Sequence, residues 1–95
     1  MVGILIVAHG AFGEALIHCA GHVMGKRPPQ VLQLGVTIHD DPEAILPQAK
    51  ELVKLLDEGD GVLVFSDILG ATPSNIATRL LEPGRVEGIS GVNLP

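Results

Sequence analysis

Short apolar runs alternate along this chain with longer segments in which apolar residues recur at helical spacing. Four runs rich in β-branched residues are predicted to be strands, at residues 4–8, 31–34, 61–65 and 86–90. Three segments between them are predicted to be helices, at residues 12–24, 42–59 and 72–81. The alternation is typical of an α/β fold, in which helices connect parallel strands.

The ends of the predicted helices carry recognisable capping residues. Gly25 is a plausible C-cap for the first helix. Asp41 before Pro42, and Thr72 before Pro73, place a capping side chain ahead of a proline whose missing N–H costs nothing in the first turn. Pro47 lies several residues inside the second helix, so we expect it to kink that helix or to delay its start.

We expect one domain over residues 1–95, built as a three-layer αβα arrangement around an open parallel sheet. The sheet is expected to hold about four strands in the order 2-1-3-4, with the first strand central. The composition agrees: 46% of the residues are hydrophobic but only 2% are aromatic, which suits a sheet buried on both faces by aliphatic side chains. So short a chain has a marginal core, so a partner subunit or further sequence is expected.

Charge and cysteine content exclude several classes of protein. The net charge is −5, and basic patches and aromatic stacking platforms are lacking, which argues against a nucleic-acid ligand. Cys19 is the only cysteine, so an internal disulfide is impossible; we expect it in the core and the protein in a reducing compartment. With neither a signal-like N-terminus nor a membrane-length apolar segment, the chain is expected to be cytoplasmic, without membrane insertion.

The predicted topology brings together two polar residues that are distant in sequence. In open parallel sheets, ligands bind beyond the carboxyl ends of the strands where the strand order reverses. His9 ends the first strand and Asp67 follows the third, so an imidazole and a carboxylate should meet there. A carboxylate on one ring nitrogen fixes the tautomer and leaves the other nitrogen nucleophilic. Alternatively, His9 is an ordinary strand-end residue and Asp67 an ordinary loop acid.

The N-termini of the two nearby helices could help His9 to accept a phosphoryl group. Amide groups at a helix N-terminus bind phosphate, and two predicted helices begin beside this crevice. Gly10, Gly70 and Ala71 would leave the approach uncrowded, and the hydroxyl of Thr72 could donate to a phosphate oxygen, although capping alone also explains Thr72. Reversible transfer between histidines requires no metal and no cofactor.

Three segments carry a resemblance to a known family: Val7-Ala8-His9-Gly10, the stretch from Phe65 to Asn75 with its Asp-x-x-Gly-x-Thr-Pro-x-Asn element, and residues 88–95. They resemble the IIA component of the mannose-family sugar phosphotransferase system (PTS). The resemblance implies that His9 is phosphorylated, that Asp67 orients it and that Thr72 contacts the phosphate. It also implies that the phosphocarrier HPr is the donor and that a histidine of a IIB protein or domain is the acceptor.

The resemblance also implies that something is missing at the C-terminus. Family members continue with a further helix and a last strand, which two subunits commonly exchange, and this chain stops short of that element. A homodimer is therefore expected only where the full-length C-terminus is present. The residues do not identify a sugar.

Three other hypotheses remain open for the site. One is a regulatory phosphoprotein of an incomplete phosphotransferase system, and another is a subunit of a dihydroxyacetone phosphorylation system. The third is a small tetrapyrrole metal chelatase, which Asp67 disfavours because a second metal-facing histidine is expected there.

Among the other histidines, His39 lies close enough to the crevice to touch a partner. His18 and His22 are one helical turn apart, but we expect them to face solvent rather than bind a metal. Gly21 to Lys26 has the wrong spacing for a phosphate-binding P-loop.

Overall fold

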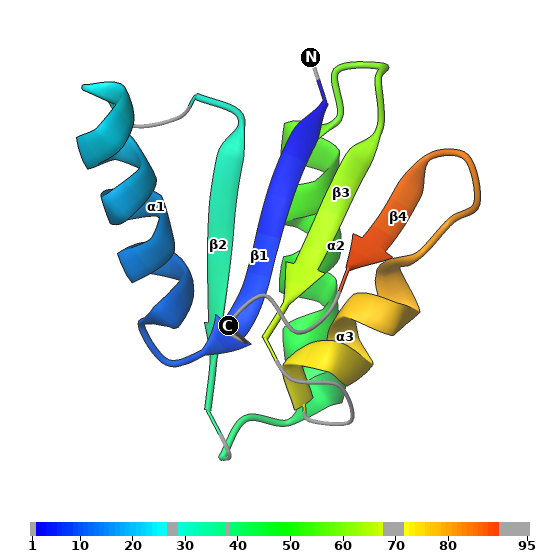
Figure 1. Cartoon of the computed structure of the whole chain (residues 1–95). Helices are drawn as coiled ribbons and strands as arrows, with labels where there is room; N and C mark the ends of the chain where they lie inside the picture. Colours follow the sequence, from blue (N-terminus) through cyan, green and yellow to red (C-terminus); the bar gives the residue numbers. More distant parts are fainter. Residues whose placement is uncertain (1, 27–28, 38, 68–71, 90–95) are drawn as a thin grey trace.

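Four parallel strands form the centre of the molecule in the computed structural model, which describes residues 2–26, 29–37, 39–67 and 72–89. The strands are β1 (Gly3–His9), β2 (Val31–Val36), β3 (Val62–Ser66) and β4 (Val86–Ile89). They lie in the order β2-β1-β3-β4, and every neighbouring pair is parallel (Figure 1). The predicted α/β fold and the strand order 2-1-3-4 are confirmed.

Helices cover both faces of this sheet. α1 (Phe12–Met24) lies on one face against β1 and β2, whereas α2 (Pro42–Leu56) and α3 (Thr72–Leu80) pack together on the other face (Figure 1). This is the expected three-layer arrangement. It follows from the right-handed crossover that each parallel β–α–β connection makes.

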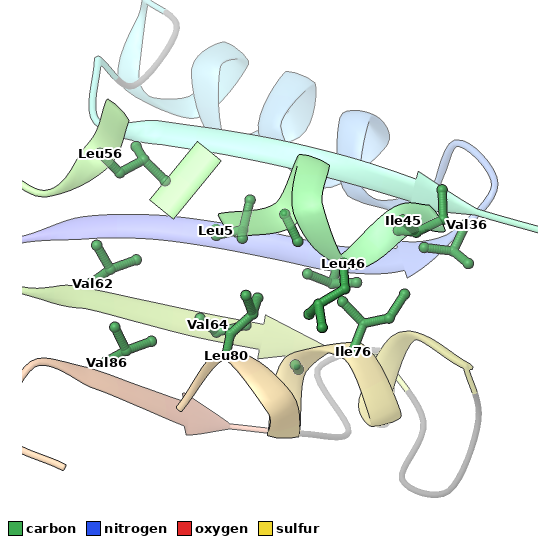
Figure 2. Close-up of a cluster of buried hydrophobic side chains, with 13 residues drawn as sticks. Leu5, Val36, Ile45, Leu46, Leu56, Val62, Val64, Ile76, Leu80 and Val86 are labelled. Carbon is green, nitrogen blue, oxygen red and sulfur yellow. The ribbon is translucent and has the colours of Figure 1, made fainter. Parts of the chain in front are cut away.

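The larger hydrophobic core lies between the sheet and the α2–α3 layer (Figure 2). Its side chains are aliphatic and come from six elements: Leu5, Val7, Val36, Ile45, Leu46, Ala49, Leu56, Val62, Val64, Ile76, Ala77, Leu80 and Val86. On the opposite face, Ile6 and Ala8 of β1 pack with Ile17 of α1. β1 is therefore buried on both sides, which places its last residue in a rigid setting.

Helix boundaries follow the capping residues closely. α1 ends at Met24, and Gly25 has the left-handed φ of 81° that its predicted role as C-cap requires. Asp41 caps α2 by accepting a hydrogen bond from the N–H of Glu43 (3.0 Å). α2 stops at Leu56 rather than at the predicted Gly59, because the Asp57 carboxylate accepts the N–H groups of residues 59 and 61 and turns the chain.

Of the two outcomes expected for Pro47, a delayed start of α2 does not occur. The helix runs from Pro42, because the Asp41 cap and the burial of neighbouring core residues outweigh the one hydrogen bond that proline removes. The expected kink stays a prediction. The expectation for Cys19 is wrong. Cys19 is exposed rather than part of the core. The buried side of α1 carries Gly13 and Ile17, and a residue two positions after Ile17 faces away from it.

β1 extends one residue beyond the predicted end and β2 two residues beyond it. His9 is consequently the last residue of β1 and pairs with Val36 of β2. The other strand ends and the end of α3 lie within one residue of the predicted positions. Within the described ranges, no helix has the length and apolar character needed to cross a membrane.

An ion pair joins α2 and α3 at the protein surface. The guanidinium of Arg79 on α3 donates to both carboxylate oxygens of Glu43 on α2, at 2.7 and 3.2 Å. The hydrogen bond and the charge of Arg79 lower the pKa of Glu43 below its ordinary value. Both groups remain solvent-accessible, so the pair fixes orientation more than it adds stability.

The carboxylate of Asp57, in the turn after α2, makes the free energy of unfolding depend on pH. The hydrogen bond from the Gly59 N–H, and then that from Arg85 (2.9 Å), hold the pKa of Asp57 below its ordinary value of 3.8. A lowered folded-state pKa stabilises the fold fully above the ordinary pKa, and this contribution is lost as pH falls through the folded value. We expect Asp57→Asn to lower the urea midpoint near neutral pH, and its difference from wild type to shrink below about pH 3.8.

The matched control for this prediction is Glu51→Gln, which removes an exposed carboxylate 3.9 Å from Lys54. Its urea midpoint should match wild type at every pH, because exposed pairs contribute little. A midpoint difference for Asp57→Asn that stays constant down to about pH 2 would contradict the assignment.

Candidate functional site

The site lies where β1 and β3 end side by side at the carboxyl edge of the sheet. Val7 of β1 pairs with Ser66 of β3, so the residues after these positions project from the same edge. His9 closes β1, and Asp67 directly follows β3. The strand order reverses here, since β1 is flanked by β2 on one side and β3 on the other.

His9 and Asp67 are in direct contact. The Nδ1 atom of the His9 ring lies 2.8 Å from Oδ2 of Asp67, and the main-chain N–H of His9 donates to the same oxygen at 3.0 Å. Asp67 is only 3% exposed, whereas the His9 side chain is 39% exposed. One end of the imidazole is therefore anchored in the protein, and part of the ring remains open to a partner.

This contact determines the useful tautomer of the neutral ring. An ionised carboxylate only accepts hydrogen bonds, so Nδ1 must carry the proton in the 2.8 Å contact. Nε2 then holds an unshared electron pair. The arrangement can act as a nucleophile toward an electrophilic centre without any other base, because no proton must be removed from Nε2 first.

The turn after His9 leads directly into α1. Gly10 adopts a left-handed φ of 53°, and its N–H donates to the carbonyl of Val36 at 2.9 Å. Ala11 occupies the N-cap position and makes no side-chain capping bond. The positive end of the α1 dipole therefore begins two residues after His9 without a capping side chain from Ala11, a setting that favours an anion.

The remaining predicted phosphate contacts are only partly described. Gly70 and Ala71 lie outside the described residues. Thr72 is the first residue of α3, but its side chain is not described. The proposed contact of Thr72 with phosphate stays a prediction.

The other histidines are separate from the His9–Asp67 pair. His39 lies in an exposed turn beyond β2, where its N–H donates to Thr37 Oγ1 at 3.3 Å and Thr37 N–H donates to Asp40 at 2.7 Å. This turn is at the same edge of the sheet as His9, and a role in partner contact stays a prediction. His18 and His22 are exposed on α1, as expected. Within the described ranges, histidine, cysteine and acidic residues form no cluster of three that could hold a metal.

Sequence reasoning missed the contribution of β2 to this site. Val36 receives the Gly10 N–H, and Gly35 lies directly against the Gly10 carbonyl. A glycine inside a predicted strand is a recognised signal for close backbone approach, so Gly35 could have been singled out. Nothing in the sequence indicated which backbone approaches it.

Comparison with known proteins identifies the family. A family model named EIIA-man, described as "PTS system fructose IIA component", matches residues 3–95, nearly the whole chain. The chain belongs to this family. The resemblance to the mannose-family PTS IIA component is thereby confirmed.

Individual relatives agree with this assignment. The PTS system fructose-specific EIIA component of Bacillus subtilis is 28% identical over 96 residues, which cover all of this chain and 65% of that protein. The PTS IIA protein associated with the fucose utilization operon of Streptococcus pneumoniae has 28% identity and a TM-score of 0.84, and the match covers 100% of this chain and 75% of that one. This chain thus spans about two thirds of the length of the fructose-specific relative.

A third relative belongs to a different class of protein. The transcriptional regulatory protein LevR of Bacillus subtilis is 32% identical over 68 residues, which cover 70% of this chain and only 7% of the regulator. IIA-like sequence therefore occurs within a much longer regulatory protein.

The tautomer of His9 can be tested directly. We expect long-range proton–nitrogen correlation spectra, recorded near about pH 8 where an ordinary histidine is neutral, to show His9 protonated on Nδ1. In Asp67→Ala this preference should be lost, and the orphaned N–H of His9 should cost about 1–3 kcal/mol of stability. Asp67→Asn should keep the Nδ1–H form, because the main-chain N–H of His9 selects the amide oxygen as its acceptor.

The control is His18→Ala, which leaves the spectrum of His9 unchanged because His18 lies on the exposed surface of α1. Protonation of wild-type His9 on Nε2 would contradict the assigned geometry.

Proposed function

We propose that His9 is a phosphoryl relay: Nε2 accepts a phosphoryl group from the phosphocarrier HPr and passes it to a histidine of a IIB protein or domain. The observation that carries this proposal is the 2.8 Å contact between His9 Nδ1 and the buried Asp67 carboxylate. It supports a ring with a fixed orientation, a fixed tautomer and one free nucleophilic nitrogen.

The chemistry needs no further participant. The electron pair of Nε2 attacks phosphorus, the P–N bond of the donor phosphohistidine breaks, and its electron pair returns to the donor imidazole. His9 then carries protons or substituents on both nitrogens and is cationic. The Asp67 carboxylate stabilises this cation, and a buried carboxylate does so more strongly than an exposed one.

Transfer onward follows by the same route in reverse. The acceptor is also a histidine, so the free energies of donor and product are similar and neither metal nor general acid is needed. The ring is partly exposed, and Gly10 and Ala11 beside it are small and exposed, so another protein's imidazole can approach Nε2. Such a relay works in the cytoplasm, where its partners would meet it.

A phosphorylation assay tests this function. The full chain is incubated with phosphoenolpyruvate, enzyme I and HPr, and its intact mass is measured. We expect an acid-labile increase of one phosphoryl group in wild type and none in His9→Ala. Asp67→Asn should retain the adduct but form it about tenfold to a thousandfold more slowly, as expected when one charge-stabilising group is lost.

His39→Ala, His18→Ala and His22→Ala are the matched controls, because these histidines are exposed but lie outside the Asp67 contact. Each should accept the phosphoryl group at the wild-type rate. A phosphoryl adduct in His9→Ala, or an adduct in wild type that resists acid, would show that the proposed residue or bond is wrong.

The second candidate function is regulatory, and the similarity to LevR favours it. Here the phosphorylation state of His9 controls a partner or an attached domain, and the phosphoryl group is not passed to a IIB protein. The two functions separate in a chase experiment: phosphorylated protein, freed of donor, is mixed with IIB. Rapid loss of the phosphoryl group to IIB supports the relay, and retention supports the regulatory function.

A further inference from the structure

The turn that follows His9 packs directly against the backbone of β2. Gly35 allows the closest contact: a Cβ atom at this position would lie within 3.0 Å of the carbonyl oxygen of Gly10, closer than real Cβ atoms come. The obstacle is backbone rather than a flexible side-chain tip. The Gly10 carbonyl therefore occupies space that only glycine at position 35 leaves open.

Both backbone groups of Gly10 face β2. Its N–H donates to Val36 at 2.9 Å, and its carbonyl oxygen lies against Gly35. Gly10 adopts a left-handed φ of 53° in this turn, a conformation that costs glycine little and other residues more. The peptide is trans, so the N–H of Ala11 points away from β2.

Gln33 supports the next residues of the same segment. A Cβ atom at Gly13, in the first turn of α1, would lie 3.1 Å from Cβ of Gln33 and 3.4 Å from its Oε1. This Oε1 atom is buried and has no hydrogen-bond partner among the described residues. It also lies 3.7 Å from the Cβ position of Gly35, so it borders the same space as the Gly10 carbonyl oxygen.

Two acceptor oxygens therefore border the space at the Gly35 Cβ position, and the buried oxygen of Gln33 is unfavourable there without a donor. The two ends of a glutamine amide have nearly the same shape, and their assignment follows from the hydrogen bonds that each can make. Turning the amide of Gln33 by half a rotation places Nε2 in this space, where it can donate toward the carbonyl of Gly10.

We propose that Gly35 and Gln33 are positioning residues for His9: Gly35 admits the Gly10 carbonyl, and the Gln33 amide nitrogen holds it. His9 is then held in two ways. Asp67 binds its main-chain N–H and its ring, and β2 holds Gly10, the residue that follows. The expected effect on the phosphorylation rate rests on the proposed phosphoryl transfer, whereas the expected effects on the His9 spectra and on Gly10 hydrogen exchange do not.

Gly35→Ala is the main test. It should displace the Gly10 carbonyl, shift the imidazole nitrogen signals of His9, and slow phosphorylation of His9 about tenfold to a hundredfold, as small misplacements of a reacting group do. Gln33→Leu keeps the side-chain bulk and removes the amide. It should perturb the same signals and slow phosphorylation by a smaller factor, with the adduct still on His9.

Gly3→Ala is the matched control, because its Cβ would meet the carbonyl oxygen of Leu56 at 2.8 Å at the opposite end of β1. It imposes a similar clash with a backbone carbonyl, far from the site. Its urea midpoint should fall as in Gly35→Ala, while the His9 signals and the phosphorylation rate per folded molecule stay at wild-type values.

Amide hydrogen exchange in wild type tests the proposal even if Gly35→Ala does not fold. Gly10 N–H should exchange as slowly as the interior amides of β1, and Gln33→Leu should speed it at least about tenfold relative to Val7. Rapid exchange of Gly10 in wild type would overturn the proposal. So would wild-type phosphorylation and His9 spectra in Gly35→Ala, or an equal loss of rate in Gly3→Ala.

Failure of this proposal differs from failure of the proposed function. If wild type takes no phosphoryl group from HPr, the relay is wrong, yet the His9 spectra and Gly10 exchange still report whether β2 holds the turn. If wild type is phosphorylated on His9 but Gly35→Ala behaves like wild type, only the positioning role is lost.

Discussion

A single carboxylate oxygen organises the functional end of this protein. Oδ2 of Asp67 accepts both the main-chain N–H and the ring Nδ1 of His9. The first bond fixes where the residue sits, and the second fixes how its ring is turned and which nitrogen carries the proton. Because Asp67 is almost completely buried, its charge interacts with the ring through a medium of low dielectric constant. Orientation and electrostatic stabilisation therefore come from the same atom.

The rest of the fold places that atom. His9 and Asp67 are 58 positions apart in sequence and meet because parallel strands deliver their carboxyl ends to one edge. β1 supports this edge rigidly, since residues such as Val7 and Ala8 are fully buried on opposite faces of the sheet. The aliphatic core beneath α2 and α3 stabilises the sheet, and it does so without aromatic residues (Figure 2). Replacing the carboxylate would leave this core intact while removing the two contacts that orient His9.

Most of this arrangement could be predicted because it depends on short-range patterns. Apolar runs and capping residues located the strands and helices, and the alternation of elements implied the parallel order that brings His9 to Asp67. The pattern could not decide whether Pro47 delays the start of α2, because the outcome depends on how strongly the cap and the tertiary core hold that helix. Nor could it show that Cys19 faces solvent, since the direction of a small residue on a helix follows from which side packs on the sheet. In the contact of Gly35 with Gly10, the backbone of β2 packs against the backbone of the turn after β1, and residue types alone do not encode such a contact.

The starts of α1 and α2 meet the same physical requirement in different ways. At the start of α2, Asp41 caps the free N–H groups with its own carboxylate, which stabilises the helix and neutralises its positive end. At the start of α1, Ala11 makes no such bond, so the positive end beside His9 keeps its capacity to attract an anion. An acidic residue at position 11 would stabilise α1 and would also repel a phosphoryl group arriving at His9. The start of α1 and the turn before it are instead held by contacts with β2, through Gln33, Gly35 and Val36. Support from the neighbouring strand replaces the missing cap, and in the proposed relay it leaves the open side of the turn to the phosphoryl group.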